Sequence, residues 1–148
     1  MSKYLPDTIP FLEPVLENEI LFWEHCNNKC LMFPSCAKCG LTSHPSVSVC
    51  PKCQSIKWEW HKAPETASLY TYTITHYAAD ESIIDNVPYN VAVVIFPQLD
   101  DLRFVSNIVD IEPEEIFIDM ELELIWQPFQ DNRFVPRFKK KIQKEDLK

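Results

Sequence analysis

Four cysteines between positions 36 and 53 form the pattern with the best-defined chemistry in this sequence. They occur as two Cys-x2-Cys pairs, Cys36 with Cys39 and Cys50 with Cys53. Two such pairs are typical of zinc ribbons, in which four thiolates surround Zn2+ tetrahedrally and leave no position for a reactive water molecule. We therefore expect a structural zinc ion. A sulfur-only site also suits iron, but nothing in the sequence indicates an electron-transfer partner.

The only glycine of the chain, Gly40, directly follows the second cysteine of the first pair. The chain reverses around each pair, and the residue after the second cysteine often needs a positive φ, which glycine adopts at the least cost. Gln54 holds the equivalent place after Cys53. The second turn must therefore avoid positive φ or accept a small strain.

The two remaining cysteines, Cys26 and Cys30, form a looser pair near the end of a predicted helix. A second metal site would need two more ligands, and only His25 and His44 are close in the sequence. We interpret the pair as small buried hydrophobic residues, which free cysteines often are. His44 lies inside the ribbon loop and can replace a thiolate, but four cysteines already suffice.

No catalytic pattern accompanies the cysteines. A chain with one glycine has neither a glycine-rich phosphate loop nor a G-x-S-x-G elbow, and H-E-x-x-H is also absent, so we expect no catalytic residues. Asp80, Glu81 and Asp85 are close together, but nothing nearby would shift their pKa, so we interpret them as a solvated acidic loop. Ile83 and Ile84 in this loop predict either a partner contact or a fold-back onto the barrel mouth.

Charge divides the chain into three parts. Residues 1–62 carry six lysines and six acids, residues 63–138 three arginines and fourteen acids, and residues 139–148 five lysines and two acids. The middle part would repel a phosphate backbone, which argues against nucleic acid as a partner. The apolar content is 46%, and the sequence has neither a basic and apolar leader nor an apolar run near 18 residues. We therefore expect a globular, cytoplasmic protein without a membrane partner.

Hydrophobic spacing predicts a helix over Glu13–Asn27 and two short strands, 31–34 and 57–61, on either side of the cysteine segment. From position 67 the pattern becomes β. Five strands are predicted, with one helical turn at 113–115, over residues 69–77, 89–96, 102–109, 120–126 and 133–138. Such a set is compatible with a small barrel such as the OB-fold, although periodicity alone does not define that topology.

These elements predict a mainly β protein with three parts. Residues 1–62 form an N-terminal helix and a rubredoxin-like zinc ribbon, residues 63–138 form a five-stranded OB-fold domain, and residues 139–148 form a basic tail. We expect the tail to be frayed, as chain ends often are.

The ordered set of segments resembles the acyl-CoA-associated OB-fold family with an N-terminal rubredoxin-like zinc ribbon, the thiolase-partner proteins formerly classed as a domain of unknown function. The resemblance extends from about Leu16 to Phe138. The segments that carry it are Phe22-Trp23-Glu24, Cys36-Ala37-Lys38-Cys39-Gly40, Cys50-Pro51-Lys52-Cys53, Tyr70-Thr71-Tyr72-Thr73, Pro88-Tyr89-Asn90-Val91-Ala92-Val93-Val94 and Val135-Pro136-Arg137-Phe138.

The resemblance implies a non-catalytic scaffold for a thiolase-like or other acyl-CoA-processing enzyme, such as an enoyl-CoA hydratase or an aldolase. In such complexes the OB domain helps shape the passage for the CoA arm, so CoA thioesters are an implied ligand at a shared site. Relatives have glycines at the entry to the first barrel strand and before the fourth, where this chain has Ala67-Ser68 and Asp119. The barrel corners here must turn on other residues.

An alternative function is single-stranded nucleic-acid binding by a zinc-ribbon and OB-fold module. Tyr70, Tyr72, Phe104 and Trp126 would then serve as stacking platforms for bases. The fourteen acids of residues 63–138 make this the weaker hypothesis. An independent acyl-CoA-processing enzyme ranks last, because no nucleophile or base is evident.

Overall fold

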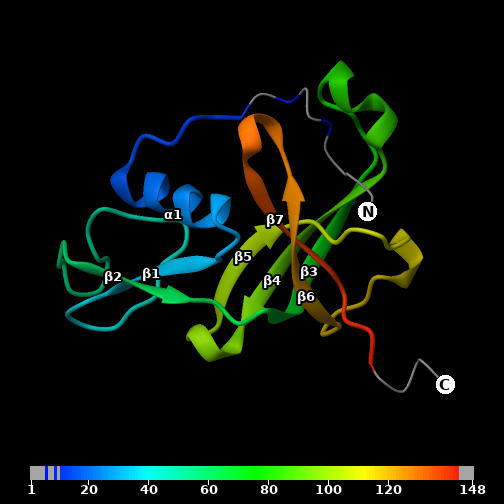
Figure 1. Ribbon diagram of the computed structural model, residues 1–148. Coiled ribbons are helices and arrows are strands. Elements are labelled where there is room, and N and C mark those ends of the chain that lie inside the picture. The colour runs from blue at the N-terminus through cyan, green and yellow to red at the C-terminus, as the bar shows by residue number, and fades with distance from the viewer. Residues whose placement is uncertain (1–5, 7–8, 10, 144–148) are drawn as a thin grey trace.

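The structure is a computed structural model that describes residues 6, 9 and 11–143. Within that part of the chain, one helix and two antiparallel sheets make up the fold (Figure 1). The elements are α1 (Glu17–Asn27), β1 (Met32–Cys36), β2 (Trp58–Lys62), β3 (Thr66–Thr75), β4 (Tyr89–Phe96), β5 (Leu102–Ser106), β6 (Glu121–Pro128) and β7 (Phe134–Lys140), with 3-10 turns at Glu81–Asn86, Pro97–Leu99, Pro113–Glu115 and Gln130–Asn132. The predicted fold class, a helix, a four-cysteine ribbon and a five-stranded OB-like sheet, is confirmed.

The first sheet is a two-stranded ribbon. β1 and β2 pair antiparallel from Met32 with Lys62 to Cys36 with Trp58, and the cysteine segment forms the loop between them. Figure 1 shows α1 lying along this ribbon at one end of the molecule, with the five-stranded sheet at the other. The ribbon thereby carries the cysteines away from the barrel.

The second sheet has the strand order β5-β4-β3-β6-β7. β3 is long enough to pair with β4 along most of its length and with β6 through Thr66–Ser68, and a register shift between Leu69 and Thr71 lets it bend from one partner to the other. The two edges of the sheet meet at a parallel bridge between Ile108 and Phe138. This order and closure are those of a five-stranded OB-type barrel.

The closing bridge is held by a buried asparagine. Asn90 donates from Nδ2 to the carbonyl of Ile108 and accepts from the Ile108 amide at Oδ1, both at 2.7 Å. The amide of Val109 in turn donates to the carbonyl of Phe138 at 2.8 Å. Buried backbone groups need hydrogen-bond partners, and β5 has ended before Ile108. The Asn90 side chain therefore provides the partners for the Ile108 amide and carbonyl that a neighbouring strand would otherwise provide.

One hydrophobic core joins the ribbon to the barrel. Phe33 on β1 is fully buried, and its ring centroid lies 5.8 Å from that of Phe96 on β4 and 5.6 Å from that of Phe104 on β5. Phe22 of α1 stacks on Phe33 at 6.1 Å, and its ring centroid also lies 6.2 Å from that of Phe104. The end of the ribbon near β1 is therefore anchored in the barrel core.

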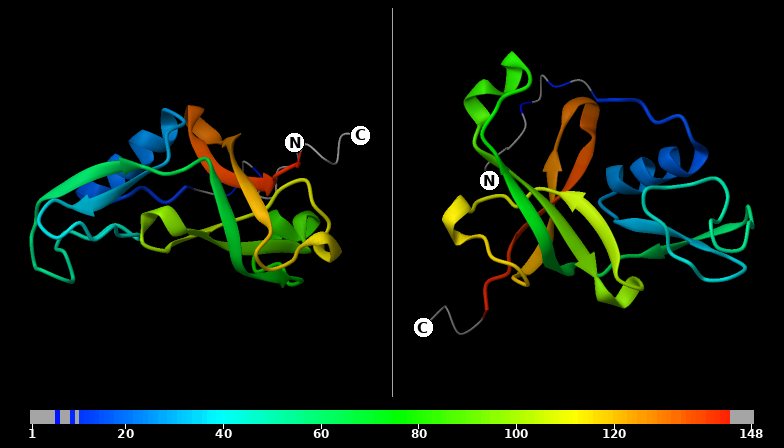
Figure 2. Two further views of the ribbon diagram at one scale, coloured as in Figure 1. Left: turned by 90° about the horizontal axis from the view of Figure 1, so that it is seen from below. Right: turned by 180° about the vertical axis from the view of Figure 1, so that it is seen from behind.

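The helix ends at Asn27, as predicted, but begins at Glu17 and not at Glu13. The residues before it are held in an extended path by distant contacts: the Phe11 ring lies 6.5 Å from that of Phe129, and Glu13 pairs with Arg133 at 2.6 Å. Figure 2 shows this segment crossing over the β6–β7 turn. Tertiary contacts thus replace the first predicted helical turn.

The strand boundaries differ from the predicted ones by a few residues. β5 ends at Ser106 because the next residues leave the β4 edge for the closing bridge, so the predicted extension to Val109 is wrong. β7 continues to Lys140, and Lys139 pairs with Glu123 at 3.0 Å, so the predicted frayed tail begins as an ordered strand. Residues 144–148 of that tail lie outside the described residues.

The described helices give no candidate for a membrane crossing, since none combines the required length with sufficient apolar character.

Candidate metal centre

The first cysteine pair forms a tight turn closed by two backbone hydrogen bonds. The Gly40 amide donates to the carbonyl of Cys36 at 2.8 Å, and the Cys36 amide donates to the carbonyl of Leu41 at 2.9 Å. Gly40 has a φ of 75°, and an added Cβ would meet nothing within 4 Å. The glycine is therefore needed for its backbone conformation and not for space.

The second pair repeats this turn without a glycine. The Gln54 amide donates to the carbonyl of Cys50 at 2.9 Å, and the Cys50 amide donates to the carbonyl of Ser55 at 2.8 Å. Gln54 has a φ of 60°. The sequence left open whether this turn avoids positive φ or accepts strain, and the structure shows the strained, left-handed conformation. The two cysteine turns therefore have the same backbone conformation.

The two turns bring the four cysteine sulfurs together. The Sγ atoms of Cys36 and Cys53 are 3.5 Å apart, those of Cys39 and Cys50 are 3.6 Å apart, and all four lie within 4.8 Å of one another. These distances are too long for disulfides. Zn–S bonds of about 2.3 Å in a tetrahedron separate the sulfurs by about 3.8 Å, so the cluster has the size and shape of a four-thiolate metal site.

Backbone amides are directed at the sulfurs of this cluster. Burial would raise the pKa of the Cys36 thiol, but hydrogen bonds from the backbone amides of Cys39 and Lys38 outweigh it and lower that pKa to about 6. Cys50 receives the same pair of bonds from the amides of Cys53 and Lys52. Each turn therefore stabilises the thiolate form of its first cysteine, which is the form that binds a metal.

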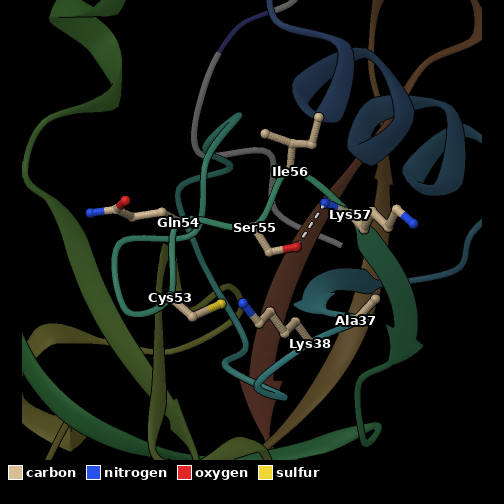
Figure 3. Close-up of a pocket in the computed structure, with 7 residues that line it drawn as sticks. All are labelled: Ala37, Lys38, Cys53, Gln54, Ser55, Ile56 and Lys57. Carbon is tan, nitrogen blue, oxygen red and sulfur yellow. Dashed lines mark hydrogen bonds between the residues drawn. The ribbon is translucent and has the colours of Figure 1, made fainter.

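Cys53 lies at the surface side of the cluster. It lines a hollow of about 460 Å3 together with Lys38 and Lys57, and the Ser55 hydroxyl accepts a hydrogen bond from the Lys57 amide there at 3.2 Å (Figure 3). Four thiolates and one divalent ion would leave a net negative charge, and Figure 3 shows the Lys38 ammonium group next to the Cys53 sulfur, where it would offset part of that charge.

The other two cysteines are not part of this cluster. Cys26 is fully buried in the core beside α1, and burial together with the nearby Cys30 raises the pKa of its thiol to about 12. It is therefore a protonated, apolar residue near neutral pH. His44 is not part of the four-cysteine cluster either, and its ring packs against Phe22, Phe33 and Phe104 instead.

The two isoleucines of the acidic loop differ in burial. Ile83 is buried, whereas Ile84 is 61% exposed. Ile83 is not part of the core cluster, so its burial does not decide between a fold-back onto the barrel mouth and a partner contact, and Ile84 is the more accessible of the two. Hydrogen bonds from the Ser82 hydroxyl and from the Ser82 amide, the latter at 2.8 Å, lower the pKa of the Asp80 carboxyl, so Asp80 acts as a turn residue.

The proposed stacking platforms are not arranged on one open surface. Phe104 is buried, so its assignment to base stacking is wrong. Tyr72 is held in place by its hydroxyl group, which donates a hydrogen bond to the carbonyl of Ile116 at 3.1 Å, and Trp126 packs against the core. Tyr70 is exposed, but Arg103 covers its ring at 4.1 Å. These placements give the nucleic-acid hypothesis no support.

Comparison with known proteins identifies the family. A family model described as ChsH2, C-terminal OB-fold domain, matches residues 60–127. A DUF35 domain-containing scaffold protein of Methanothermobacter thermautotrophicus is 30% identical over 111 residues, which cover 74% of this chain and 81% of that protein. The chain belongs to the DUF35 family. A second DUF35 scaffold protein, from Methanocaldococcus jannaschii, is 29% identical over 112 residues, covering 74% and 77% of the two chains.

A further relative of this DUF35 chain is much longer. The probable enoyl-CoA hydratase alpha subunit of Thermomonospora curvata is 29% identical over 134 residues, which cover 90% of this chain. The chain spans only 41% of that relative's length.

Two solved structures resemble the DUF35 chain. A chain of the Ltp2-ChsH2(DUF35) aldolase matches with a TM-score of 0.78 and 27% identity, over 88% of this chain and 100% of that one. A DUF35 protein of unknown function from Sulfolobus solfataricus matches with a TM-score of 0.60 and 20% identity, over 84% and 86% of the chains, and shares the fold.

One feature of the DUF35 chain was not predicted from the sequence. Arg137, which entered the prediction only as part of a motif, is buried beside Gln127 and lines a cavity that also contains His44. The available signal was a single charge between apolar neighbours in Val135-Pro136-Arg137-Phe138.

Proposed function

We propose that this protein is a non-catalytic accessory subunit that binds an acyl-CoA-processing enzyme, with a thiolase-like enzyme as the first candidate, and that its four cysteines hold a structural zinc ion. The observation that carries the proposal is the match along the full length of a chain that belongs to a two-component aldolase. The names of the two scaffold relatives support a non-catalytic role.

The zinc assignment is supported by the donor set. Cys36, Cys39, Cys50 and Cys53 are four thiol donors at tetrahedral spacing, and they leave no position for a substrate or a reactive water molecule. Zinc bound there would stabilise the ribbon without taking part in a reaction. Metal analysis of the reduced protein should give one zinc per chain, and iron or no metal would contradict this part of the proposal.

A groove between α1 and the ribbon is the surface that best fits an enzyme partner. It has a volume of about 400 Å3, and its apolar walls are Leu21, Val49, Ile56, Trp58 and Trp60. Ile56 is 73% exposed and Val49 is half exposed. Large apolar side chains that gather around a surface groove typically mark a protein contact. This α1–ribbon groove lies away from the acidic barrel, so its contacts do not require a basic partner.

Co-purification tests the proposal. The protein is expressed together with the thiolase-like enzyme of its own source, and the enzyme carries an affinity tag. The amount of the protein that an affinity column retains through the tagged enzyme is measured, and size-exclusion chromatography shows whether the two elute as one complex. We expect a stable complex. If none of the tagged acyl-CoA-processing enzymes of that source retains the protein, the accessory function is wrong.

Two matched variants locate the contact. Ile56→Asp places a charge in the α1–ribbon groove, whereas Ile84→Asp places one in the acidic loop at a comparably exposed position. We expect Ile56→Asp to weaken retention at least tenfold and Ile84→Asp to leave it unchanged. The reverse result would move the contact to the barrel loop and refute the role of the groove.

A further inference from the structure

A second cavity lies where α1, the ribbon loop and the outer side of the barrel meet. It has a volume of about 190 Å3, compared with roughly 30 Å3 for one water molecule in the liquid. Its apolar walls come from Phe22 and Trp23 of α1, Phe104 and Val105 of β5, and Val135 and Pro136 of β7. Val105 is 60% exposed, so the cavity reaches the surface on that side.

One charged side chain lines this cavity. Arg137 is only 8% exposed, and its Nε donates to Oε1 of Gln127 at 3.1 Å. That bond uses the Nε–H and leaves the N–H groups of both Nη atoms for other partners. Within residues 11–143 of the described chain, Nε makes the hydrogen bond of the guanidinium group, and the two Nη groups are not fully enclosed, so they face the open cavity, which no carboxylate lines.

Burial lowers the pKa of Arg137 to about 10, with no nearby acid to oppose the effect. The side chain is therefore still charged at neutral pH. A largely buried cation without a counter-ion is unfavourable, because it has lost most of its hydration and gained no ion pair in return. The Arg137 position therefore favours an anion that enters the cavity.

The remaining polar group of the cavity is His44. Burial lowers the pKa of His44 to about 4, so the ring is neutral near pH 7. Its Nδ1 is buried and has no hydrogen-bond partner in the part of the chain that the structure describes. A neutral imidazole adds a hydrogen-bonding group to the cavity without adding charge.

We propose that this cavity binds the carboxylate of a small apolar acid, with Arg137 as the anion-binding residue. The planar guanidinium group matches a carboxylate through two parallel hydrogen bonds. A single arginine among apolar walls suits a monoanion with a short hydrocarbon group better than a phosphate, which carries more charge and more acceptor oxygens. The proposal does not rest on the accessory function, because it concerns a ligand of this chain alone.

An NMR titration of the full chain tests the site. The 15N-labelled protein is titrated with sodium butyrate at pH 7 and constant ionic strength, with sodium chloride, sodium acetate and inorganic phosphate as comparisons. We expect saturable shifts of the Trp23 indole and Arg137 Nε–H signals with butyrate. Acetate should bind several-fold more weakly because it fills less of the apolar space, and chloride and phosphate should give no saturation.

Three variants make the test specific. Arg137→Gln should weaken butyrate binding at least tenfold, whereas Arg103→Gln, at an exposed arginine of the same barrel, should leave it unchanged. If Arg137→Gln does not fold, Val105→Trp provides the second test, because it narrows the mouth at an exposed position and should also weaken binding at least tenfold.

Several results would overturn the proposal. These are the absence of saturable butyrate shifts in the unmodified protein, equal affinities for Arg137→Gln and Arg103→Gln, and an unchanged affinity in a folded Val105→Trp variant. Phosphate binding as tight as butyrate binding would refute the carboxylate assignment.

Discussion

The ribbon and the barrel reach a folded state by different means. In β2 of the ribbon no residue is buried, whereas alternate residues of β4 in the barrel are buried along the whole strand. The barrel strands and β1 therefore share the apolar core, whereas the ribbon loop between β1 and β2 contains the four cysteines. The comparison leads us to expect that the cysteine cluster, once it holds a metal, stabilises the ribbon loop, whereas hydrophobic burial stabilises the barrel, with Phe33 at the junction.

The largest expected effect comes from removing a metal ligand. Cys39→Ser should abolish metal binding and disorder residues 37–57, because structural zinc supplies about 10 to 16 kcal/mol in small zinc modules. The barrel signals should persist in the NMR spectrum. Metal analysis and amide peak counts measure the two effects.

Cys30→Ser is the matched control, because Cys30 lies outside the cluster. It should keep both the metal and the ribbon signals. If Cys39→Ser unfolds the barrel as well, the two regions form one cooperative unit and the proposed separation is wrong.

The junction between the two regions should give the next largest effect. Phe33→Ala removes a fully buried ring that contacts Phe22, Phe96 and Phe104. We expect a loss of about 3 to 5 kcal/mol in the free energy of unfolding, measured in urea. Ile84→Ala, at an exposed position, should change it by less than about 0.5 kcal/mol. A small effect of Phe33→Ala would mean that the ribbon does not depend on the barrel core.

Acid should weaken the same junction through His44. Its pKa in the folded protein, about 4, is below the ordinary value of 6.5, so the unfolded chain binds more protons between these values. The contribution of His44 to stability is therefore complete above pH 6.5 and is lost as the pH falls toward 4, by an amount on the order of 2 kcal/mol. Urea unfolding at pH 7 and pH 5 measures it.

His44→Phe isolates this effect from other acid-sensitive groups, including the cysteines. The variant should lose less stability between pH 7 and pH 5 than the unmodified protein does. Equal losses in the two proteins would show that His44 is not buried in its neutral form.

The smallest expected effect compares the two cysteine turns. Gly40→Ala should destabilise the ribbon by about 1 kcal/mol, because an alanine at a φ of 75° is strained even where space is open. Gln54→Gly should stabilise it by a similar or smaller amount, because it relieves the same strain at a φ of 60°. Competition with a zinc chelator measures both. Effects of the same sign would contradict the equivalence of the turns.

The sequence predicted most elements because their patterns are local. The β4 segment alternates between buried and half-buried residues along its length, and its predicted boundaries at Tyr89 and Phe96 are confirmed. Boundaries that depend on distant contacts were wrong. The helix begins late because Phe11 and Glu13 are held by the β6–β7 turn, and β5 ends early because Asn90 takes over its pairing.

The barrel corners, which lack glycine, also combine a feature that the sequence predicted with one that depends on distant contacts. The sequence indicated that the corner before the fourth barrel strand must turn without glycine, and Asp119 does so with a φ of 66° while its amide donates to the carbonyl of Leu69 at 2.9 Å. Aspartate tolerates this conformation better than most residues. The conformation itself follows from the pairing of β3 with β6, which no local pattern contains.

The sequence by itself determined the four-cysteine cluster, because two Cys-x2-Cys turns need only short-range backbone geometry to direct their sulfurs to one point. It also determined the strand content, because side-chain alternation is a property of consecutive residues. Only the tertiary structure decided that Phe104 is buried, that Ile83 is buried whereas Ile84 is exposed, and that Arg137 lines a cavity with His44. Burial of these residues depends on elements far apart in the chain, and their packing sets which side chains meet water.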